Sequence, residues 1–437
     1  MSYQAIVATL ENVQPHPNAD RLQIATVLNG SHNIVVGLEN KTGDVGVYFA
    51  TDGKLSEEYC IQNELFPIYD QSGAKIGGGM FDPKNRRVRA QNLRSVKSDG
   101  YFASLDSVAF TGVNLADLYV GFQFDVLNDV LICEKYYTPQ TLRAMKGGTA
   151  ATRRVVPMLP MHQDTKQFAY EAETIAVGSI CTTTLKIHGT SHRLANALVD
   201  VEHPQKWHHK ILRKTPRITQ EWKIVHGTRR VILGEHDERM SFYGTDKFRY
   251  DATAFLEPNL KKGEVIYGEI VGYVNDTTLV MGEVSTKDLK KDREFKSFFG
   301  GTIPETMKYT YNCLPGQADF YVYRIAMADE EGNLVELSWP QVKKRCRELG
   351  AKFCPDFGLL PYTVSKKEGI AELEEIVENF NSGADPIDPS HIREGVVVRV
   401  DQPDGSVRFL KSKNYFFKVL ESIIKANEDY IDTEEVS

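Results

Sequence analysis

The chain has 437 residues, of which 41% are hydrophobic and 25% charged, and its formal net charge is -7. This length predicts two or three domains, and the composition is that of an ordinary globular protein. The acidic balance argues against a protein that coats nucleic acid through overall positive charge, although it allows a local basic groove. No apolar run approaches the ~20 residues of a membrane-spanning helix, so we expect no membrane partner.

The N-terminus, MSYQAIVATLENV, lacks the charged start and apolar core of a signal peptide, so we expect a cytoplasmic protein. The six cysteines contain no CxxC pair. Their scattered positions predict neither a zinc site nor a disulfide framework. We expect a monomer, although the sequence does not determine the oligomeric state.

Residues 1–130 have the pattern of short strands separated by turns. The expected strands are Tyr3–Thr9, Leu22–Leu28, Asn33–Val36 and Val45–Ala50. Asn29–Gly30 and Asp52–Gly53 are among the turn signals between them. Strands at this spacing predict a small all-β barrel.

Residues 131–167 are mixed in character and are interpreted as a linker or a layer between domains. From about Phe168 onward strands dominate again, with apolar runs at Val265–Val274, Phe320–Ala326 and Gly395–Val400. Three helices are expected late in the chain. One is capped by Ser338 and ends at Gly350, one has an apolar stripe from Ile370 to Phe380, and one spans about Tyr415 to Ala426.

Three short motifs carry residues suited to nucleotide chemistry. Lys186 precedes a glycine turn in Lys186–Ile187–His188–Gly189–Thr190–Ser191. Glu269 lies on an apolar strand, where a carboxylate suits a ribose hydroxyl. Tyr321 and Tyr323 occupy alternate positions of an aromatic strand, so they share one face and either ring could stack on a base.

Two further motifs follow near the C-terminus. Glu394 directly precedes an apolar strand, where a carboxylate must be paired or must bind a cation. Lys411 and Lys413 are two residues apart on a strand, so they project from one face in an arrangement that suits a polyphosphate. Each motif alone is common among solvated or core side chains, and their order along the chain is the informative feature.

In order, these motifs resemble the signature of covalent nucleotidyltransferases, which are the polynucleotide ligases and capping enzymes. That signature reads Kx(D/H)G, a strand glutamate, an aromatic strand, EGxVxR and KxK, and the resemblance covers roughly Met158 to Lys413. It implies an α+β chain in which residues 168–437 form an adenylyltransferase domain of antiparallel sheets with flanking helices. It also implies three steps: a lysine takes AMP from ATP, AMP moves to a 5′-phosphate, and a 3′-hydroxyl displaces AMP.

His188 narrows the resemblance. KIHGTS resembles the KxHGT motif of phage-type and editing-type RNA ligases, whereas most DNA ligases and capping enzymes resemble KxDG. His162–Gln163–Asp164–Thr165 also resembles a segment that precedes the lysine motif in such ligases. Only 24 residues follow Lys413, so we expect no C-terminal OB domain of the kind found in DNA ligases and capping enzymes. These features favour an ATP-dependent RNA ligase of RNA repair that uses Mg²⁺ or Mn²⁺.

The resemblance assigns roles residue by residue. The catalytic residues would be Lys186, His188, Arg229, Lys411 and Lys413. The nucleotide-binding residues would be Lys186, Gly189, Glu269, Tyr323, Lys411 and Lys413. Glu394 would bind the metal through water molecules.

Two assignments depend on local context. Arg229 resembles an arginine that contacts AMP and the 5′-phosphate, although Arg230 is adjacent to it. Arg324 stands where the family usually has Asp, and the resemblance implies no role for it. A lysine is nucleophilic only when it is deprotonated, and its ordinary pKa is about 10.4. We therefore expect nearby cations to lower the pKa of Lys186.

The N-terminal region has a resemblance of its own. Residues Val13–Leu22 and Leu93–Gly100 resemble the OB-fold tRNA-binding module of some tRNA synthetases, and a barrel ahead of the transferase domain resembles RNA ligases with an N-terminal OB domain. The residues expected to line its nucleic-acid groove are Arg87, Arg89, Arg94 and Lys97. We expect this domain to deliver RNA, while the pocket from Lys186 to Lys413 suffices for adenylation.

Other functions are compatible with the sequence. The substrate could be a nick in DNA or in an RNA–DNA hybrid, and within RNA it could be a nicked duplex, a broken tRNA loop or open single-stranded ends. A capping guanylyltransferase is disfavoured by the missing last motif. A tRNA-binding protein with an inactive transferase domain is disfavoured by the complete set of Lys186, Glu269, Glu394, Lys411 and Lys413.

Overall fold

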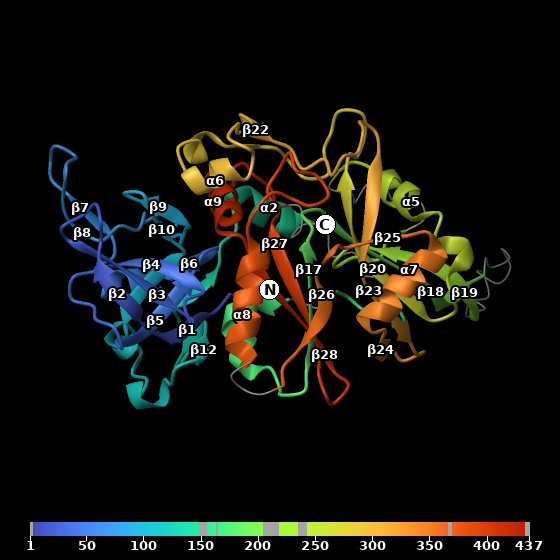
Figure 1. Cartoon of the computed structure of the whole chain (residues 1–437), viewed down its shortest axis with the longest axis horizontal. Helices are drawn as coiled ribbons and strands as arrows, with labels where there is room; N and C mark the ends of the chain where they lie inside the picture. The colour runs from blue at the N-terminus through green and yellow to red at the C-terminus, as the bar shows by residue number, and fades with distance from the viewer. Residues whose placement is uncertain are drawn as a thin grey trace, which may run out of the picture.

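The computed structural model describes residues 3–147, 155–162, 165–203, 218–234, 243–365 and 369–432. Along the long axis of the molecule, N-terminal sheets are followed by a five-stranded sheet and then by a six-stranded sheet (Figure 1). The fold is a mixture of α and β elements in which sheets predominate, as expected for an α+β protein. No helix within the described residues is long and apolar enough to cross a membrane.

Two sheets form the centre of the N-terminal part. Strands β1 (Ala5–Thr9), β5 (Val45–Ala50), β11 (Gly100–Ser104) and β12 (Gln123–Phe124) pair in the order β11-β5-β1-β12. Strands β2 (Glu11–Pro15), β3 (Leu22–Val27) and β4 (His32–Gly37) form a three-stranded sheet. The four strands predicted in this region are therefore confirmed.

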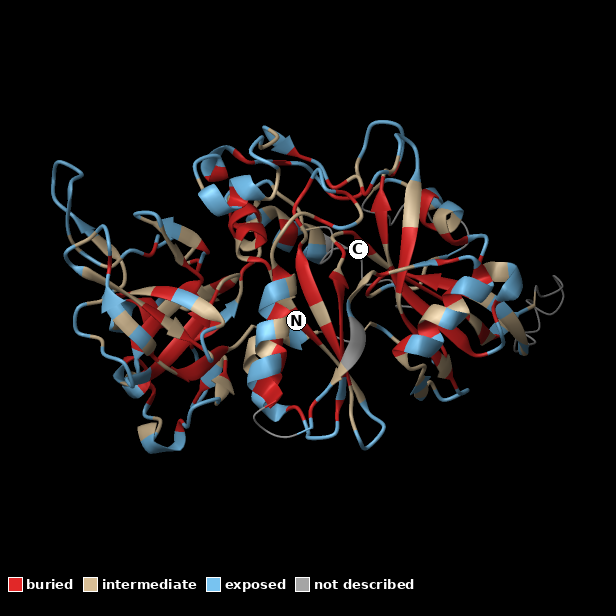
Figure 2. Ribbon diagram, in the orientation of Figure 1, coloured by how far each residue is buried: buried red, intermediate tan, exposed pale blue. Residues whose placement is uncertain are grey.

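The central strands β1 and β5 are buried on both faces. Val47 and Phe49 face one apolar core and Tyr48 and Ala50 face a second one, because successive side chains of a strand alternate in direction. The buried strands appear in red in Figure 2. Among the described residues these pairings form separate sheets rather than one closed barrel, so the predicted OB barrel is not confirmed.

Smaller elements complete the N-terminal part. The strands are β6 (Gly53–Leu55), β7 (Pro67–Tyr69), β8 (Lys75–Gly78), β9 (Gln91–Leu93), β10 (Val96–Ser98), β13 (Val126–Leu127), β14 (Val130–Leu131) and β15 (Cys133–Lys135), and the helices are α1 (Glu57–Gln62), η1 (Leu105–Thr111), η2 (Leu115–Asp117) and α2 (Pro139–Gly147). Strand β15 pairs with β6, and both β15 and α2 lie within the stretch predicted as a linker. That stretch therefore carries regular structure and forms a two-stranded sheet with β6.

The five-stranded sheet presents the lysine motifs. Its order is β16 (Lys166–Gln167), β28 (Val407–Lys413), β27 (Gly395–Asp401), β17 (Ile180–Lys186) and β26 (Asp356–Thr363). Helices α3 (Phe168–Glu171) and α8 (Gly369–Asn381) cover one face, where they pack on Val396, Val398 and Val400. Val397 and Arg399 therefore point to the opposite face.

The six-stranded sheet lies beside it. Its strands are β19 (Ile218–Gly227), β18 (Thr190–Glu202), β20 (Glu264–Gly272), β23 (Ala318–Ala328), β24 (Leu334–Glu336) and β25 (Lys352–Phe353). Helix α7 (Trp339–Leu349) packs on β23. It starts at the capping residue Ser338 and stops at Gly350, whose φ is 69°. Both predicted ends of this helix are confirmed.

The remaining elements surround these sheets. They are η3 (Ala172–Thr174), α5 (Lys247–Thr253), η5 (Glu257–Asn259), β21 (Val284–Ser285), η6 (Lys287–Leu289), α6 (Arg293–Ser297), β22 (Thr306–Met307) and α9 (Tyr415–Ile424). Helix α9 begins where the Asn414 side chain accepts a hydrogen bond from the Phe416 amide. Its apolar face, which includes Phe416 and Leu420, enters the largest core. Its polar face contacts the N-terminal part, so α9 connects the two parts of the molecule.

Candidate active site

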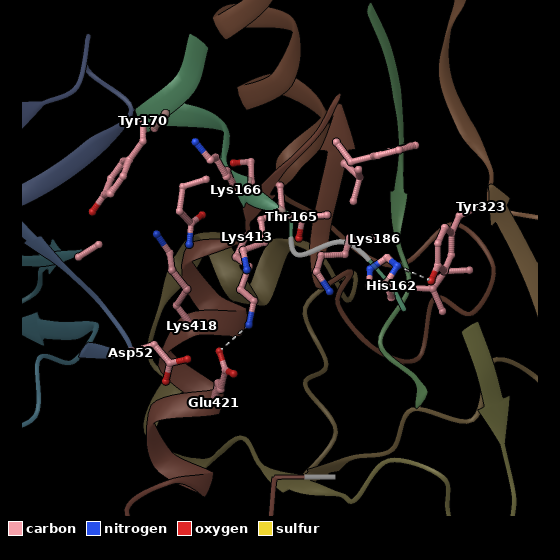
Figure 3. Close-up of a pocket in the computed structure, with 18 of the residues that line it drawn as sticks. Asp52, His162, Thr165, Lys166, Tyr170, Lys186, Tyr323, Lys413, Lys418 and Glu421 are labelled. Atoms are coloured by element: carbon pink, nitrogen blue, oxygen red, sulfur yellow. Dashed lines mark hydrogen bonds and ion pairs between the residues drawn. The ribbon is translucent and has the colours of Figure 1, made fainter. Parts of the chain in front are cut away.

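A cavity of about 390 Å³ lies where the N-terminal part, the five-stranded sheet and the six-stranded sheet meet (Figure 3). The predicted residues that line it are Lys186, Arg229, Glu269, Tyr323, Lys411 and Lys413. The N-terminal residues Tyr3, His32, Asp52 and Lys135 line the same cavity. The fold therefore gathers six predicted residues from five strand or loop segments, and it adds a wall from the N-terminal part.

Strand register brings Lys186 to Glu394. Lys186 is opposite Gly395 in the β17–β27 pair, and Gly395 is opposite Lys413 in the β27–β28 pair. Lys186 Nζ lies 2.8 Å from Glu394 Oε1, and Lys413 Nζ lies 3.5 Å from the same oxygen. Two lysines, one from each strand that flanks β27, thus converge on the carboxylate that directly precedes β27.

Gly395 permits this convergence. Its φ is 150°, and a Cβ atom at this position would lie 2.0 Å from the carbonyl oxygen of Ser412. Only glycine combines this backbone conformation with so close an approach of β28. The glycine of the EGxVxR motif is therefore explained by strand geometry.

The electrostatics of the site follow from burial and from these pairings. Burial alone would raise the pKa of Glu394, but the charges of Lys186 and Lys413 hold it well below its ordinary value. Burial opposes the charged form of Lys413, yet Glu421 and Glu394 raise its pKa above the ordinary value. Burial and the charge of Lys413 together lower the pKa of Lys411 to about 7. The two lysines of the KxK motif thus differ: Lys413 stays charged at neutral pH, and Lys411 titrates there.

His188 lies behind Lys186. Its Nδ1 is 3.6 Å from Glu394 Oε2, and its backbone amide donates to the Tyr311 hydroxyl at 2.7 Å. The imidazole packs edge-on against Tyr309 and Phe417, with ring centroids 4.6 and 4.9 Å away. These contacts hold the turn after Lys186 in place, so His188 supports Lys186 and Glu394 from the core side.

Gly189 brings this turn against β20. A Cβ at Gly189 would lie 2.4 Å from the Ile270 carbonyl oxygen and 2.8 Å from Glu269 Cγ. Glu269 is paired with Ser191 across the β18–β20 register. The absence of a side chain at Gly189 therefore lets Glu269 lie beside the lysine motif.

Tyr323, and not Tyr321, faces the cavity. In the β20–β23 pair, Tyr267 is opposite Arg324 whereas Gly268 is opposite Val322, so Tyr323 is the extra residue of a β-bulge. Its hydroxyl lies 3.3 Å from Ser191 Oγ and 3.4 Å from His162 Nδ1. Tyr321 is buried in the largest core instead. The bulge decides between two rings that strand alternation alone leaves equivalent.

Arg324 and Arg229 also lie at the cavity. Arg324 is buried, donates from Nε to both carboxylate oxygens of Glu336 at 2.9 and 3.1 Å, and lies over the Tyr267 ring. It therefore joins β23 to β24 from the cavity wall. Arg229 is buried and follows β19. In the predicted segment His162–Gln163–Asp164–Thr165, His162 and Thr165 line the cavity, whereas Gln163 and Asp164 lie outside the described residues.

The acidic groups fit a cation that is held mainly by water and phosphate. No group of three or more His, Cys, Asp or Glu side chains suited to a metal exists within the described ranges. Glu394 Oε2 is buried and has no hydrogen-bond partner among them. One available carboxylate is what Mg²⁺ commonly uses when substrate phosphates and water complete its octahedron.

The residues predicted to line the N-terminal groove fall into two groups, one in contact with C-terminal helices and one exposed. Arg87 is buried, donates to the Ser422 carbonyl of α9 at 3.0 Å and stacks on Tyr136. Lys97 forms an ion pair with Glu294 of α6 at 2.5 Å and lies over Phe416. Arg89 and Arg94 are exposed. Arg87 and Lys97 are therefore engaged with helices of the C-terminal part, because α9 and α6 supply their partners.

Three charged residues that contact Lys413 directly or through one another were not among the site residues predicted from the sequence. They are Asp52, Glu421 and Lys425, all of which line the cavity. A signal was available for the last two, because Lys418, Glu421 and Lys425 recur at helical spacing and form a polar stripe on α9. Asp52 offered only a turn signal.

Comparisons with known proteins identify the family and similar folds. The model of the RNA ligase family matches residues 180–420. The fold is similar to that of Naegleria gruberi RNA ligase with pyrophosphate, with a TM-score of 0.56, 18% identity, and coverage of 98% of this chain and 99% of that one. A variant of that enzyme with ATP and Mn gives a TM-score of 0.54, 16% identity, and coverage of 96% and 98%. A variant with AMP and Mn gives a TM-score of 0.54 and 17% identity, with coverage of 95% of this chain and 97% of that one. No curated protein matches the sequence.

Proposed function

Because the chain belongs to the RNA ligase family, we propose that it is an ATP-dependent enzyme that joins 3′-hydroxyl and 5′-phosphate ends of RNA through a lysyl-AMP at Lys186. The observation that carries this proposal is the convergence of Lys186 and Lys413 on Glu394 beside a cavity that also contains Glu269 and Tyr323. The solved complexes of the similar Naegleria enzyme with ATP, AMP and Mn support ATP and a divalent metal as its cofactors.

The cavity offers a separate place for each portion of ATP. The Tyr323 ring would stack on adenine, and Glu269 would accept hydrogen bonds from the ribose hydroxyls. Gly189 lets β20 approach the lysine turn, which brings Glu269 to the ribose. The phosphates would lie against Arg229, Lys411 and Lys413, whose donors match phosphate oxygens. This set gives the purine, the sugar and the phosphates separate contacts.

In the first step the neutral amine of Lys186 attacks the α-phosphorus of ATP. A nitrogen–phosphorus bond forms, the bond to the bridging oxygen breaks, and pyrophosphate leaves with the electron pair while the amine proton passes to solvent. Glu394 orients Lys186 for this attack, and His188 holds the turn. Bound beside Glu394 largely through water, Mg²⁺ or Mn²⁺ would neutralise phosphoryl charge and favour the neutral amine.

The later steps use the same cavity. The 5′-phosphate of RNA attacks the lysyl-AMP phosphorus and forms an AMP-capped end, which frees Lys186. The 3′-hydroxyl then attacks the 5′-phosphorus of that end, the new phosphodiester forms, and AMP leaves. The cationic residues Arg229, Lys411 and Lys413 would stabilise the charge that develops in each transition state.

We assign residues 1–130 to an OB-fold nucleic-acid-binding domain, residues 131–167 to the layer between domains and residues 168–437 to the adenylyltransferase domain. Arg89 and Arg94 are exposed and are the residues retained for RNA phosphate contacts. Arg87 and Lys97 hold the N-terminal part against α9 and α6 instead.

The direct test is incubation with labelled ATP and Mg²⁺, followed by mass analysis of the tryptic peptides. We expect one AMP on the peptide that contains Lys186. Labelling by GTP and not by ATP would instead indicate a capping guanylyltransferase. Absence of any adduct under all metal conditions would indicate an inactive transferase domain.

A second assay defines the substrate class. The protein is offered nicked duplexes of RNA, of DNA and of mixed strands, all with the same sequence. The KxHGT motif favours RNA at the nick, so we expect the all-RNA nick to be sealed fastest. Faster sealing of DNA would contradict the RNA assignment while leaving the lysyl-AMP chemistry intact.

A further inference from the structure

Six side chains of alternating charge connect the N-terminal part to Lys186. We call them the charge chain: Asp52, Lys425, Glu421, Lys413, Glu394 and Lys186. In this order the successive nitrogen–oxygen distances are 2.7, 3.0, 2.9, 3.5 and 2.8 Å. Figure 3 labels Asp52, Glu421, Lys413 and Lys186 among the residues that line the cavity and marks the contact between Lys413 and Glu421.

Lys425 and Glu394, which flank the central Glu421–Lys413 pair, are shielded from water, whereas the side chains of Glu421 and Lys413 are 21% and 20% exposed. The Lys425 side chain is 3% exposed and that of Glu394 is 1% exposed. Burial opposes the charged form of Lys425, but Asp52 and Glu421 raise its pKa well above the ordinary value. Burial likewise opposes ionised Glu421, but Lys413 and Lys425 lower its pKa. Each of these groups therefore stays charged near neutral pH and depends on its neighbours for compensation.

The position of Lys413 depends on Glu421. One carboxylate oxygen of Glu421, Oε2, pairs with Lys413, and the other, Oε1, pairs with Lys425. Lys425 therefore fixes the orientation of the Glu421 carboxylate. Glu421 holds Lys413 at 2.9 Å, whereas Glu394 is 3.5 Å from the same nitrogen. Lys413 is held between the two carboxylates, and Glu394 keeps its shorter contact for Lys186.

Asp52 in turn fixes Lys425. Its two carboxylate oxygens accept hydrogen bonds from Lys425 Nζ at 2.7 and 3.0 Å. Its backbone is anchored, because its amide donates to the Val88 carbonyl and its carbonyl accepts from the Tyr136 amide. Asp52 is thus a rigid N-terminal partner for the helix that carries Glu421.

We propose that Asp52, Lys425 and Glu421 are positioning residues for the adenylation of Lys186, acting through Lys413 and Glu394. This inference rests on the proposed function. It assigns the N-terminal part a role in the first step, in contrast to the expectation that the pocket from Lys186 to Lys413 suffices for it. Removal of one charge takes an ion pair from its neighbours in a buried site and shifts the pairs that remain; without Asp52, Lys425 would keep Glu421 at 3.0 Å and Asp432 at 3.5 Å.

A second ion pair across the same interface provides a matched control. Lys418 of α9 pairs with Asp99, so this pair also docks the helix on the N-terminal part. Asp99 is buried like Lys425, but it does not belong to the charge chain. Asp52→Asn and Asp99→Asn therefore make the same chemical change at the same interface, and only the first alters the path to Lys186.

The experiment measures the rate of lysyl-AMP formation in single turnovers of the full chain at increasing ATP concentrations. For Asp52→Asn we expect the maximal rate to fall about tenfold, because a charge-assisted contact is lost, while the ATP concentration for half-maximal rate changes less than about threefold. Lys425→Met should lose more. The double variant that combines Asp52→Asn with Lys425→Met should be no slower than Lys425→Met alone, because both changes interrupt the same charge chain. Asp99→Asn should retain the wild-type rate.

The outcomes separate the hypotheses. Equal losses in Asp52→Asn and Asp99→Asn would show that docking alone matters and would overturn the inference, as would losses that multiply in the double variant. If Lys425→Met does not fold, as judged by thermal melting, Glu421→Gln replaces it, because it removes the charge with little change in shape. A wild-type chain without any adduct would overturn the proposed function and this inference together, whereas a normal adduct with undiminished rates in the variants would overturn the inference alone.

Discussion

Lys186 and Lys413 share one carboxylate oxygen, Glu394 Oε1, at 2.8 and 3.5 Å from their amino nitrogens. The two lysines are 227 residues apart in sequence and meet because β17 and β28 flank β27. Two lysines share one buried carboxylate, so a bound polyphosphate would compete with Glu394 for the lysines. A divalent cation would compete with the lysines for Glu394.

Lys186→Ala should abolish both the AMP adduct and the sealing of unactivated RNA ends, because no other residue is proposed as the nucleophile. The same variant should still seal RNA whose 5′ end already carries AMP, since the last step uses no free lysine. Mass analysis and gel assays measure the two activities. Lys308→Ala, which removes a partly exposed lysine paired with Glu283, serves as the control. An undiminished adduct in Lys186→Ala would refute the assignment.

Activity should vanish with EDTA and return with Mg²⁺ or Mn²⁺. Glu394→Gln keeps the shape of the side chain but removes its charge, so adenylation should fall by about 100-fold or more, as expected for a group acting on a charged transition state. Circular dichroism verifies that the variant folds. Sealing that persists without any divalent cation would contradict the role given to Glu394.

Gly395→Ala should destabilise the protein by about 2 kcal/mol or more, because a strained backbone is combined with a backbone clash. The new Cβ would lie 2.0 Å from the Ser412 carbonyl oxygen. Gly405→Ala is the matched control: its φ is 84°, but no atom lies within 4 Å of its Cβ position. Urea unfolding of both variants separates the effect of the clash from that of backbone strain. An equal decrease in the free energy of unfolding would show that β28 moves to accommodate the added methyl group.

Stability should depend on pH through Lys411. Burial and the charge of Lys413 lower its pKa from 10.5 to about 7 in the folded state. Between these pKa values the unfolded chain binds more protons than the folded one, so the contribution of Lys411 to stability is least favourable below pH 7 and improves as the pH rises toward 10.5. Urea unfolding at pH 7 and pH 9 should therefore show the wild type gaining stability relative to Lys411→Met. A constant difference between the two proteins would contradict the lowered pKa.

Replacing Arg89 and Arg94 together by Ala should weaken RNA binding and reduce its dependence on salt, because each phosphate contact contributes to that slope. Affinity is measured at two salt concentrations. Arg87→Ala should behave differently, since it loses the hydrogen bond to Ser422 and the stacking on Tyr136. We expect a lower melting temperature for Arg87→Ala with an unchanged salt slope; the opposite pattern would place Arg87 in the RNA contact.

Local physical chemistry in the sequence was sufficient for many elements and for the core of the site. The cap at Ser338 and the left-handed Gly350 delimit α7 because both act within a single helical turn. Strand alternation placed Lys411 and Lys413 on one face, and both line the cavity. Residues from the motifs that resemble a nucleotidyltransferase also meet at this cavity.

Tertiary structure decided the features that depend on long-range register and docking. The bulge opposite Tyr267 selects Tyr323 over Tyr321, since the extra residue is defined only by the pairing of β20 with β23. Arg87 is withdrawn from solvent because α9 supplies a carbonyl partner 335 residues later. Asp52 reaches the lysine centre because the same helix carries Lys425 to it. Such contacts join side chains whose separation in sequence bears no relation to their separation in space, whereas caps and alternation act between near neighbours.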